Sequence, residues 1–254
     1  GQDCDIMAAR YEISRDQQDD FALRSHQLSG IAETKGYLKN EMCEVSLEPK
    51  FKVIKSDNGI RPNSKREKLA SLRAAFDKKH GTLTAANSSF LTDGAAASLI
   101  ASESKAKELG LNPKSIIIDY AFTGQDLEDE LLLGPAYAIS KVLDKSGLSL
   151  DQMDVIELHE AFAGQVLSNI KCLESDNFAK EKLGREKAVG KIDMDKVNKW
   201  GGSLSIGHPF GATGSRLLTT ASNRLHIEGG KYALIAACAA GAHGHAMIIK
   251  KYEA

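Results

Sequence analysis

The sequence has few cysteines, and none of them are paired in a motif. Its 254 residues include only Cys4, Cys43, Cys172 and Cys238, which are too widely spaced to form a C-x-x-C pair. Such pairs hold zinc or carry out thiol exchange, so the spacing argues against both. A chain of this length buries a sizeable core without disulfide bonds, and we expect a protein of a reducing compartment.

The sequence also lacks an excess of charge of either sign. It contains 33 Lys and Arg against 34 Asp and Glu, a formal net charge of −1. Because nucleic-acid binders usually carry a basic excess, we expect no nucleic-acid partner. A long apolar run is missing as well. The uncharged stretch over residues 232–249 is interrupted by glycines and contains His243 and His245, so it predicts two buried strands and a turn.

Strand and helix signals are present, and they alternate after residue 81. We expect a helix between the capping box Ser14–Gln17 and Gly36, followed by a loop-dominated region over residues 39–79. Further helices are expected at residues 68–76, 94–109, 135–145, 160–173 and 215–227, and strands at residues 82–86, 115–122, 153–158, 232–237 and 245–250. This alternation predicts an α/β fold with a mostly parallel sheet, helices on both faces and one antiparallel strand at the end.

Reactive side chains follow predicted strands or lie in glycine-rich loops, where open α/β sheets bind ligands. They are His159 and Glu160, His208, and Cys238. A thiol, two histidines and a glutamate suit acyl transfer or carbon-acid chemistry, which needs a base of near-neutral pKa and an oxyanion site. The turn after Cys238 and a nearby histidine would favour its thiolate. The alternative is that the cysteine is an inert buried thiol and that the histidine lies in an ordinary turn.

Other ligand classes fit the sequence less well. No Gly-Lys-Ser/Thr follows the glycines at 201–214, which excludes a P-loop, and their spacing is wrong for a dinucleotide fingerprint. His243 and His245 could join His159 or His208 in a three-histidine metal site. No carboxylate or cysteine pattern supports such a site, so we predict no metal.

Three motifs in order resemble the C-terminal active-site motifs of the thiolases. They are His-Glu-Ala-Phe at 159–162, Gly-Gly-Ser-Leu-Ser-Ile-Gly-His-Pro-Phe-Gly-Ala-Thr-Gly at 201–214, and Cys-Ala-Ala-Gly at 238–241. The likeness extends upstream through residues 72–76 and 81–94 and so covers almost the whole chain. The His that opens the first motif and the Ser-Ser-Phe at 88–90 resemble the mitochondrial branch of the family that works with a hydratase/dehydrogenase alpha subunit.

The resemblance implies a thiolase-like α/β fold and a division of the chain. Residues 1–91 would be part of the loop domain, and residues 92–112 the last elements of the N-terminal thiolase domain. Residues 113–254 would be the C-terminal thiolase domain, with a mixed five-stranded sheet covered by helices. None of the four cysteines fits the motif of the family's nucleophile. The chain is therefore expected to be the C-terminal half of the enzyme and to be inactive alone.

The implied activity is that of a 3-ketoacyl-CoA thiolase, an acetyl-CoA C-acyltransferase of fatty acid β-oxidation. His208 would activate the nucleophile and help to bind the thioester oxygen, and His159 would share that oxyanion site through a water. Cys238 would move a proton between C2 of the acetyl unit and CoA. The CoA and pantetheine channel would be lined by Arg61, Ser89, Ala161 and Phe162. Ala242 departs from the family, which usually has a glycine there.

The resemblance also implies ligands, partners and a location. Coenzyme A and acyl-CoA would be co-substrates, with no covalently bound cofactor. The protein would form a homodimer, associate with the alpha subunit, and reside in the mitochondrial matrix, with inner-membrane association left open. Two rival readings remain: a non-catalytic thiolase-like assembly module, and a nucleotide-binding α/β domain. The joint presence of His159, His208 and Cys238 favours the enzyme over the assembly module.

Overall fold

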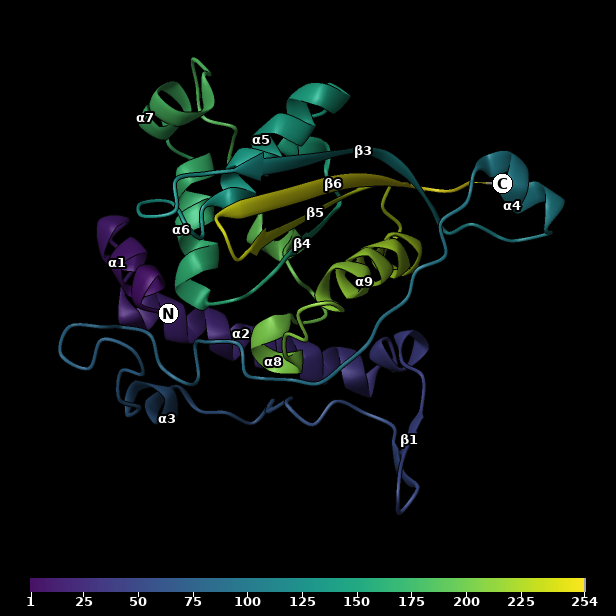
Figure 1. Cartoon of the computed structure of the whole chain (residues 1–254), viewed down its shortest axis with the longest axis horizontal. Helices are drawn as coiled ribbons and strands as arrows, with labels where there is room; N and C mark the ends of the chain where they lie inside the picture. Colours follow the sequence, from purple (N-terminus) through teal and green to yellow (C-terminus); the bar gives the residue numbers. More distant parts are fainter. Residues whose placement is uncertain (254) are drawn as a thin grey trace.

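The computed structural model describes residues 1–253 (Figure 1). Its α-helices are α1 (Gln2–Arg10), α2 (Arg15–Thr34), α3 (Arg66–Ala70), α4 (Glu103–Glu108), α5 (Gly134–Ser146), α6 (Ala163–Leu173), α7 (Asp176–Phe178), α8 (Ser203–Ile206) and α9 (Thr213–Glu228). Its strands are β1 (Val45–Leu47), β2 (Lys52–Ile54), β3 (Ser115–Gly124), β4 (Val155–Leu158), β5 (Tyr232–Ala239) and β6 (His243–Lys251). Short helical turns are η1 (Leu38–Glu41), η2 (Leu150–Gln152), η3 (Ala179–Leu183) and η4 (Met194–Lys196).

The main sheet is mixed, with the strand order β3-β6-β5-β4. Strands β4 and β5 are parallel, and β6 is antiparallel to both β5 and β3. Three strands therefore run in one direction and the last strand in the other. The predicted α/β fold with a final antiparallel strand is confirmed.

The described sheet has four strands, one fewer than the five expected. Beside β4 the sheet is extended only by a single bridge. Val197 forms one parallel bridge with Ile156, and the next residue, Asn198, has a φ of 45° that turns the backbone away from β4. The Asn198 side chain then takes the place of a strand. Its oxygen accepts from the Leu158 amide at 2.8 Å, and its nitrogen donates to the Leu158 carbonyl at 2.8 Å.

Helices cover the two faces of the sheet, as Figure 1 shows. Helix α5 packs on β3, β5 and β6, whereas α9 packs on β4, β5 and β6. Alternate side chains of β5 point to opposite faces of the sheet. Leu234 and Ala236 join the core beneath α5 and α6, while Ala233 and Ile235 pack with Leu217 and other apolar residues of α9. A further layer follows, because α6 packs against α1 and α2. The edge strand β3 is incompletely covered.

Two predicted helices are much shorter in the structure. The segment expected to form a helix at 94–109 contains only α4, and residues 94–102 have no regular structure. Leu99 and Ile100 are 81% and 65% exposed, so the segment gains no packing energy, without which a short helix is marginal in water. The helix expected at 68–76 is limited to α3. Helix α1 and the hairpin β1–β2 are additions that the sequence did not indicate.

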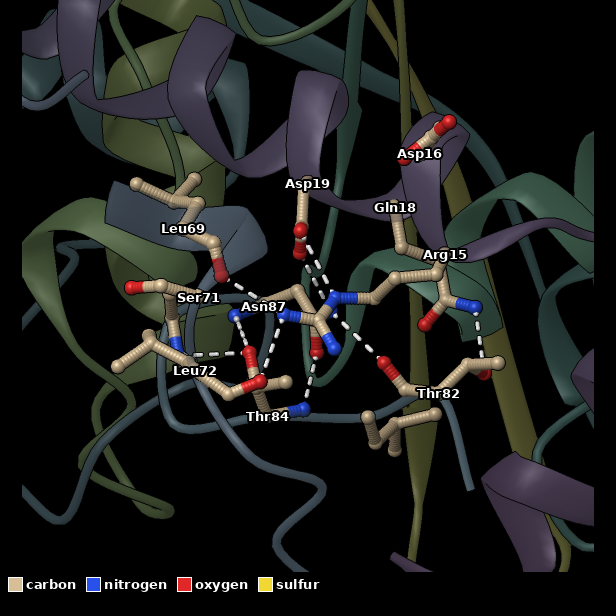
Figure 2. Close-up of polar contacts among 12 residues, drawn as sticks. Arg15, Asp16, Gln18, Asp19, Leu69, Ser71, Leu72, Thr82, Thr84 and Asn87 are labelled. Carbon is tan, nitrogen blue, oxygen red and sulfur yellow. Dashed lines mark hydrogen bonds and ion pairs between the residues drawn. The ribbon is translucent and has the colours of Figure 1, made fainter. Parts of the chain in front are cut away.

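The strand expected at residues 82–86 is absent because side chains take its backbone hydrogen bonds. The Asp5 carboxylate accepts from the Thr82 and Leu83 amides at 2.7 and 2.9 Å. The Asn87 side chain accepts from the Thr84 amide at 2.7 Å and donates to the buried Asp19 carboxylate at 2.9 Å. Figure 2 shows the part of this network around Asn87, Thr84 and Asp19, beneath α2. It fixes the 82–87 loop in place against the N-terminal helices.

No helix within residues 1–253 has the length and apolar character needed to cross a membrane.

Candidate active site

His159 lies immediately after β4 and is almost completely buried. Its amide donates to the Ala236 carbonyl of β5 at 2.8 Å, which continues the parallel ladder by one step. Its Nδ1 atom lies 3.0 Å from the hydroxyl oxygen of Ser203 in α8. Burial lowers the pKa of His159 well below its ordinary value, and the nearby His208 and the Arg216 charge lower it further. The ring is therefore neutral at pH 7.

His208 lies in the glycine-rich loop between α8 and α9. Its amide donates to Thr92 Oγ1 at 3.3 Å, and its Nδ1 lies 2.7 Å from Thr213 Oγ1 in the first turn of α9. The position before His208 can hold only glycine. Gly207 has a φ of 94°, and a Cβ there would lie 2.1 Å from Thr92 Oγ1. Burial and the Arg216 charge lower the pKa of His208, so this half-buried ring is also neutral and available as a base.

The structure brings the two predicted histidines into contact. Their ring centroids are 4.0 Å apart and their planes are inclined by 42°. They come from different segments, one after β4 and one before α9, and meet at the end of the sheet. Two neutral imidazoles at one point supply both a hydrogen-bond donor and a proton acceptor, which acyl transfer requires.

Cys238 is the next-to-last residue of β5 and lies at the same end of the sheet. It is two residues beyond Ala236, whose carbonyl accepts from the His159 amide. The side chain is buried, and burial raises the pKa of its thiol to about 12. The expected low-pKa thiolate is therefore wrong. A thiol that keeps its proton suits a proton donor. The following turn closes although Ala242 replaces the usual glycine, because Ala242 itself adopts a left-handed φ of 55°.

Glu160 is a buried carboxylate that organises the loops around the histidines. It accepts from the Asn198 side chain at 2.6 Å, the Ser25 hydroxyl at 2.7 Å and the Leu204 amide at 3.2 Å. Burial raises its pKa, and these hydrogen bonds oppose that rise. The carboxylate thus ties α2, the 198–204 loop and the end of β4 together, which is a positioning role.

Sequence reasoning missed two side chains that contact the histidines and a third that lies next to one of them. They are Ser203, Thr213 and Arg216, whose guanidinium lies 3.4 Å from the Ser203 hydroxyl. Ser203 and Thr213 stand within the quoted 201–214 motif, so their hydroxyl groups were a visible signal. Arg216 is two residues past that motif, and only the fold of α9 places it at the site.

Three of the four predicted CoA-channel residues lie together. The Ser89 amide donates to the Ala161 carbonyl at 2.9 Å, and Ser88 forms an isolated bridge with Phe162. The Phe162 ring meets Phe76 edge to face, with centroids 5.9 Å apart. An apolar wall beside small polar residues is typical of a small-molecule binding site.

Arg61 reaches the same region through its loop. Its side chain is exposed and donates to the Gly59 carbonyl at 2.6 Å. Gly59 packs so closely on Phe90 that a Cβ there would lie 2.0 Å from the ring. The loop of Arg61 therefore abuts the residue after Ser89, and an exposed guanidinium at this rim suits a phosphate group.

Other features of the molecule lie apart from these residues. A cavity of about 600 Å³ between residues 97–117 and α9 is lined by none of the predicted site residues. Within residues 1–253, no group of three or more His, Cys, Asp or Glu side chains is arranged to hold a metal ion. The His245 ring contacts the Phe122 ring of β3, with ring centroids 4.7 Å apart and the planes inclined by 42°.

Comparison with protein families gives two matches. The family described as "Thiolase, C-terminal domain" matches residues 111–251, and "Thiolase, N-terminal domain" matches residues 1–104. The human "Trifunctional enzyme subunit beta, mitochondrial" is 52% identical over 252 residues, which are 99% of this chain and 52% of that protein. The Caenorhabditis elegans "Probable 3-ketoacyl-CoA thiolase" is 54% identical over 253 residues, 99% of this chain and 56% of that protein.

Solved structures give the same result for the fold. Human mitochondrial 3-ketoacyl-CoA thiolase superposes with a TM-score of 0.84 at 32% identity, covering 99% of this chain and 59% of that one. The structure of human mitochondrial 3-ketoacyl-CoA thiolase in complex with CoA gives 0.83 at 34% identity, covering 98% and 58%. The chain spans about half the length of the curated relatives that it matches.

Proposed function

The chain belongs to the thiolase family, and from this premise we propose that it forms part of a 3-ketoacyl-CoA thiolase. The reaction would cleave a 3-ketoacyl-CoA with a second CoA to give acetyl-CoA and a shortened acyl-CoA. The observation that carries the proposal is the contact between the His159 and His208 rings, 4.0 Å apart, at the end of the sheet where Cys238 lies.

The three side chains take different roles in this proposal. His208, neutral and half-buried, accepts the proton of the nucleophilic thiol and then donates to the thioester oxygen. His159 contributes to the same oxyanion site. Cys238 retains its proton at neutral pH and delivers it to C2 of the departing acetyl unit, and the thiolate that remains takes the proton of the incoming CoA thiol.

We propose that none of the four cysteines in this chain is the nucleophile. Cys4 and Cys172 are buried, and burial raises the pKa of each thiol, whereas a nucleophile needs an accessible thiolate. Cys43 is exposed, in the loop between η1 and β1, and the residues around it do not match the motif of the family's nucleophile. Cys238 has the acid/base role. The nucleophile would therefore lie outside these 254 residues.

The substrate and partners follow from the same family. CoA would bind along Arg61, Ser89, Ala161 and Phe162, with the phosphate at Arg61 and the pantetheine arm beside Phe162. We propose a homodimer that works with a hydratase/dehydrogenase alpha subunit in the mitochondrial matrix, because relatives named as trifunctional enzyme beta subunits are about 52% identical. The division at residues 91 and 112 into loop, N-terminal and C-terminal domain segments belongs to this proposal.

The test is thiolysis by the full-length protein. Incubation with acetoacetyl-CoA or longer 3-ketoacyl-CoA substrates and CoA should give acetyl-CoA, measured by mass spectrometry. His208→Asn should lower kcat by about 10²- to 10⁴-fold, because it removes the base, while His159→Asn should retain far more activity. His226→Asn, at an exposed histidine bonded to the Lys114 carbonyl, is the matched control.

The results separate the enzyme from its rivals. Absence of thiolysis with intact assembly would favour the non-catalytic module. ATP or NAD binding without CoA binding would favour the nucleotide-binding reading. Equal losses in His208→Asn and His159→Asn would show that the base has been assigned wrongly.

A further inference from the structure

The Nδ1 atom of each of the two neighbouring histidine rings lies close to a hydroxyl group. His159 Nδ1 lies 3.0 Å from Ser203 Oγ, and His208 Nδ1 lies 2.7 Å from Thr213 Oγ1. Neither Nε2 atom has a hydrogen-bond partner in the part of the chain that the structure describes. The two hydroxyl groups therefore decide which nitrogen of each neutral ring carries the proton.

The Ser203 hydroxyl has one acceptor available. The side chain is fully buried, and its oxygen faces the Arg216 guanidinium at 3.4 Å and His159 Nδ1 at 3.0 Å. A guanidinium only donates, so the hydroxyl hydrogen can go only to Nδ1. If Nδ1 carried the proton instead, that hydrogen would be buried without an acceptor, which is costly. The proton of His159 is therefore on Nε2.

The Thr213 hydroxyl accepts a hydrogen bond from its histidine, whereas the Ser203 hydroxyl donates one. It lies 3.2 Å from the Pro209 carbonyl oxygen, which only accepts. A hydroxyl has one hydrogen, so once it is donated to Pro209 the oxygen can only accept from His208 Nδ1–H. His208 then carries its proton on Nδ1 and leaves a lone pair on Nε2.

We propose that the two rings are held in opposite tautomers, so that His159 offers an Nε2–H donor and His208 an Nε2 lone pair. Ser203 and Arg216 fix the first tautomer and Thr213 fixes the second, which makes them positioning residues. The chemistry of the inference rests on the proposed function. The donor is ready for the thioester oxygen without any protonation step, and the lone pair is ready for the thiol proton.

Burial and the Arg216 charge keep both rings neutral, which the two opposite tautomers require. Both lower the pKa of His159, and both lower that of His208. The rings consequently stay neutral across the neutral pH range, where a tautomer preference has meaning. Protonating either ring would make both of its nitrogens donors and remove the distinction.

Nitrogen-15 NMR of the full-length protein labelled with ¹⁵N-histidine tests the tautomers directly, because protonated and unprotonated ring nitrogens resonate at well-separated frequencies. Spectra of His159→Asn and His208→Asn assign the signals among the histidines. We expect a protonated Nε2 in His159 and a protonated Nδ1 in His208. Protonation of the same nitrogen in both rings would overturn the inference.

Variants of the positioning residues supply a second readout. Ser203→Ala should shift His159 to a mixture of tautomers and lower kcat by roughly tenfold or more, with KM little changed. Ser203→Thr keeps the hydroxyl and should restore the His159 signals. Ser168→Ala is the matched control, since Ser168 is also fully buried and its hydroxyl has no partner within residues 1–253. Unchanged His159 signals in Ser203→Ala would contradict the inference.

The inference and the proposed function fail separately. Opposite tautomers in a protein without thiolysis would support the inference and refute the function. Thiolysis by a protein whose rings share one tautomer would refute the inference and leave the function in place.

Discussion

Asn87→Ala should destabilise the protein strongly, because this buried amide holds the 82–87 loop. Its oxygen accepts from the Thr84 amide, and its nitrogen donates to the Asp19 carboxylate and the Thr82 carbonyl. Two neutral hydrogen bonds contribute about 1 kcal/mol each and the bond to a buried charge about 2 kcal/mol. The free energy of unfolding should therefore fall by about 4 kcal/mol, and the midpoint of thermal unfolding by roughly 10 °C.

Urea unfolding measures this loss, and steady-state kinetics show what it does to the site. The loop continues to Ser89, whose amide donates to the Ala161 carbonyl, so KM for CoA should rise more than kcat falls. Asn177→Ala, at an exposed position in α7, is the matched control and should change stability by less than about 0.5 kcal/mol. A loss below about 1 kcal/mol in Asn87→Ala would refute the hydrogen-bond account of this loop.

Three further predictions concern other parts of the fold. Burial raises the pKa of Glu157 to about 7, above its ordinary value of 4.5, so its contribution to stability is full below pH 4.5 and is lost as the pH rises to 7. The Arg224 guanidinium, which pairs with Glu157 at 2.6 Å, opposes this rise without cancelling it, so Glu157→Gln should gain stability relative to wild type between pH 4.5 and pH 8 in urea unfolding. An equal difference at both pH values would contradict this. Iodoacetamide at pH 8 should label the exposed Cys43 much faster than Cys238, because burial raises the pKa of the Cys238 thiol to about 12. Mass spectrometry measures the two labelling rates, and faster labelling of Cys238 would contradict the prediction. Gly244→Ala should destabilise the protein by several kcal/mol, since its Cβ would lie 2.1 Å from the Gly134 carbonyl oxygen, and a melting temperature equal to wild type would show that β6 and α5 can separate freely.

Elements with strong local signals were predictable from the sequence. The Ser14–Gln17 capping box begins α2 as expected, with the Ser14 hydroxyl accepting from the Gln17 amide. The helix closed by Gly147 also forms, because that glycine adopts a left-handed φ of 66°. The segments at 82–86 and 94–109 failed for the opposite reason. Their structure depends on partners distant in sequence, which local periodicity does not contain.

In the candidate site too, some features were predictable from the sequence and others depend on the folded structure. The family motifs placed His159, His208 and Cys238 correctly at one end of the sheet, and the resemblance to thiolases is confirmed. The pKa of Cys238 was predicted wrongly because burial is a property of the folded core and not of a motif. The placement of Ser203 and Arg216 beside His159 depends on how the chain folds at α8 and α9, which the spacing of residues in the sequence does not predict.

The single bridge at Val197 has a consequence for solubility. A strand at the edge of a sheet exposes backbone groups that can pair with another chain and start aggregation. The outer edge of β4 is closed instead. The Asn198 side-chain nitrogen donates to the Leu158 carbonyl and to the Glu160 carboxylate, and its side-chain oxygen accepts from the Leu158 amide. The Asn198 backbone N–H donates to the Ile156 carbonyl. Asn198 thus both covers an aggregation-prone strand edge and holds the Glu160 carboxylate, which orders the loops around the histidines. Replacing Asn198 would therefore expose the edge of β4 and also weaken the order of the candidate site.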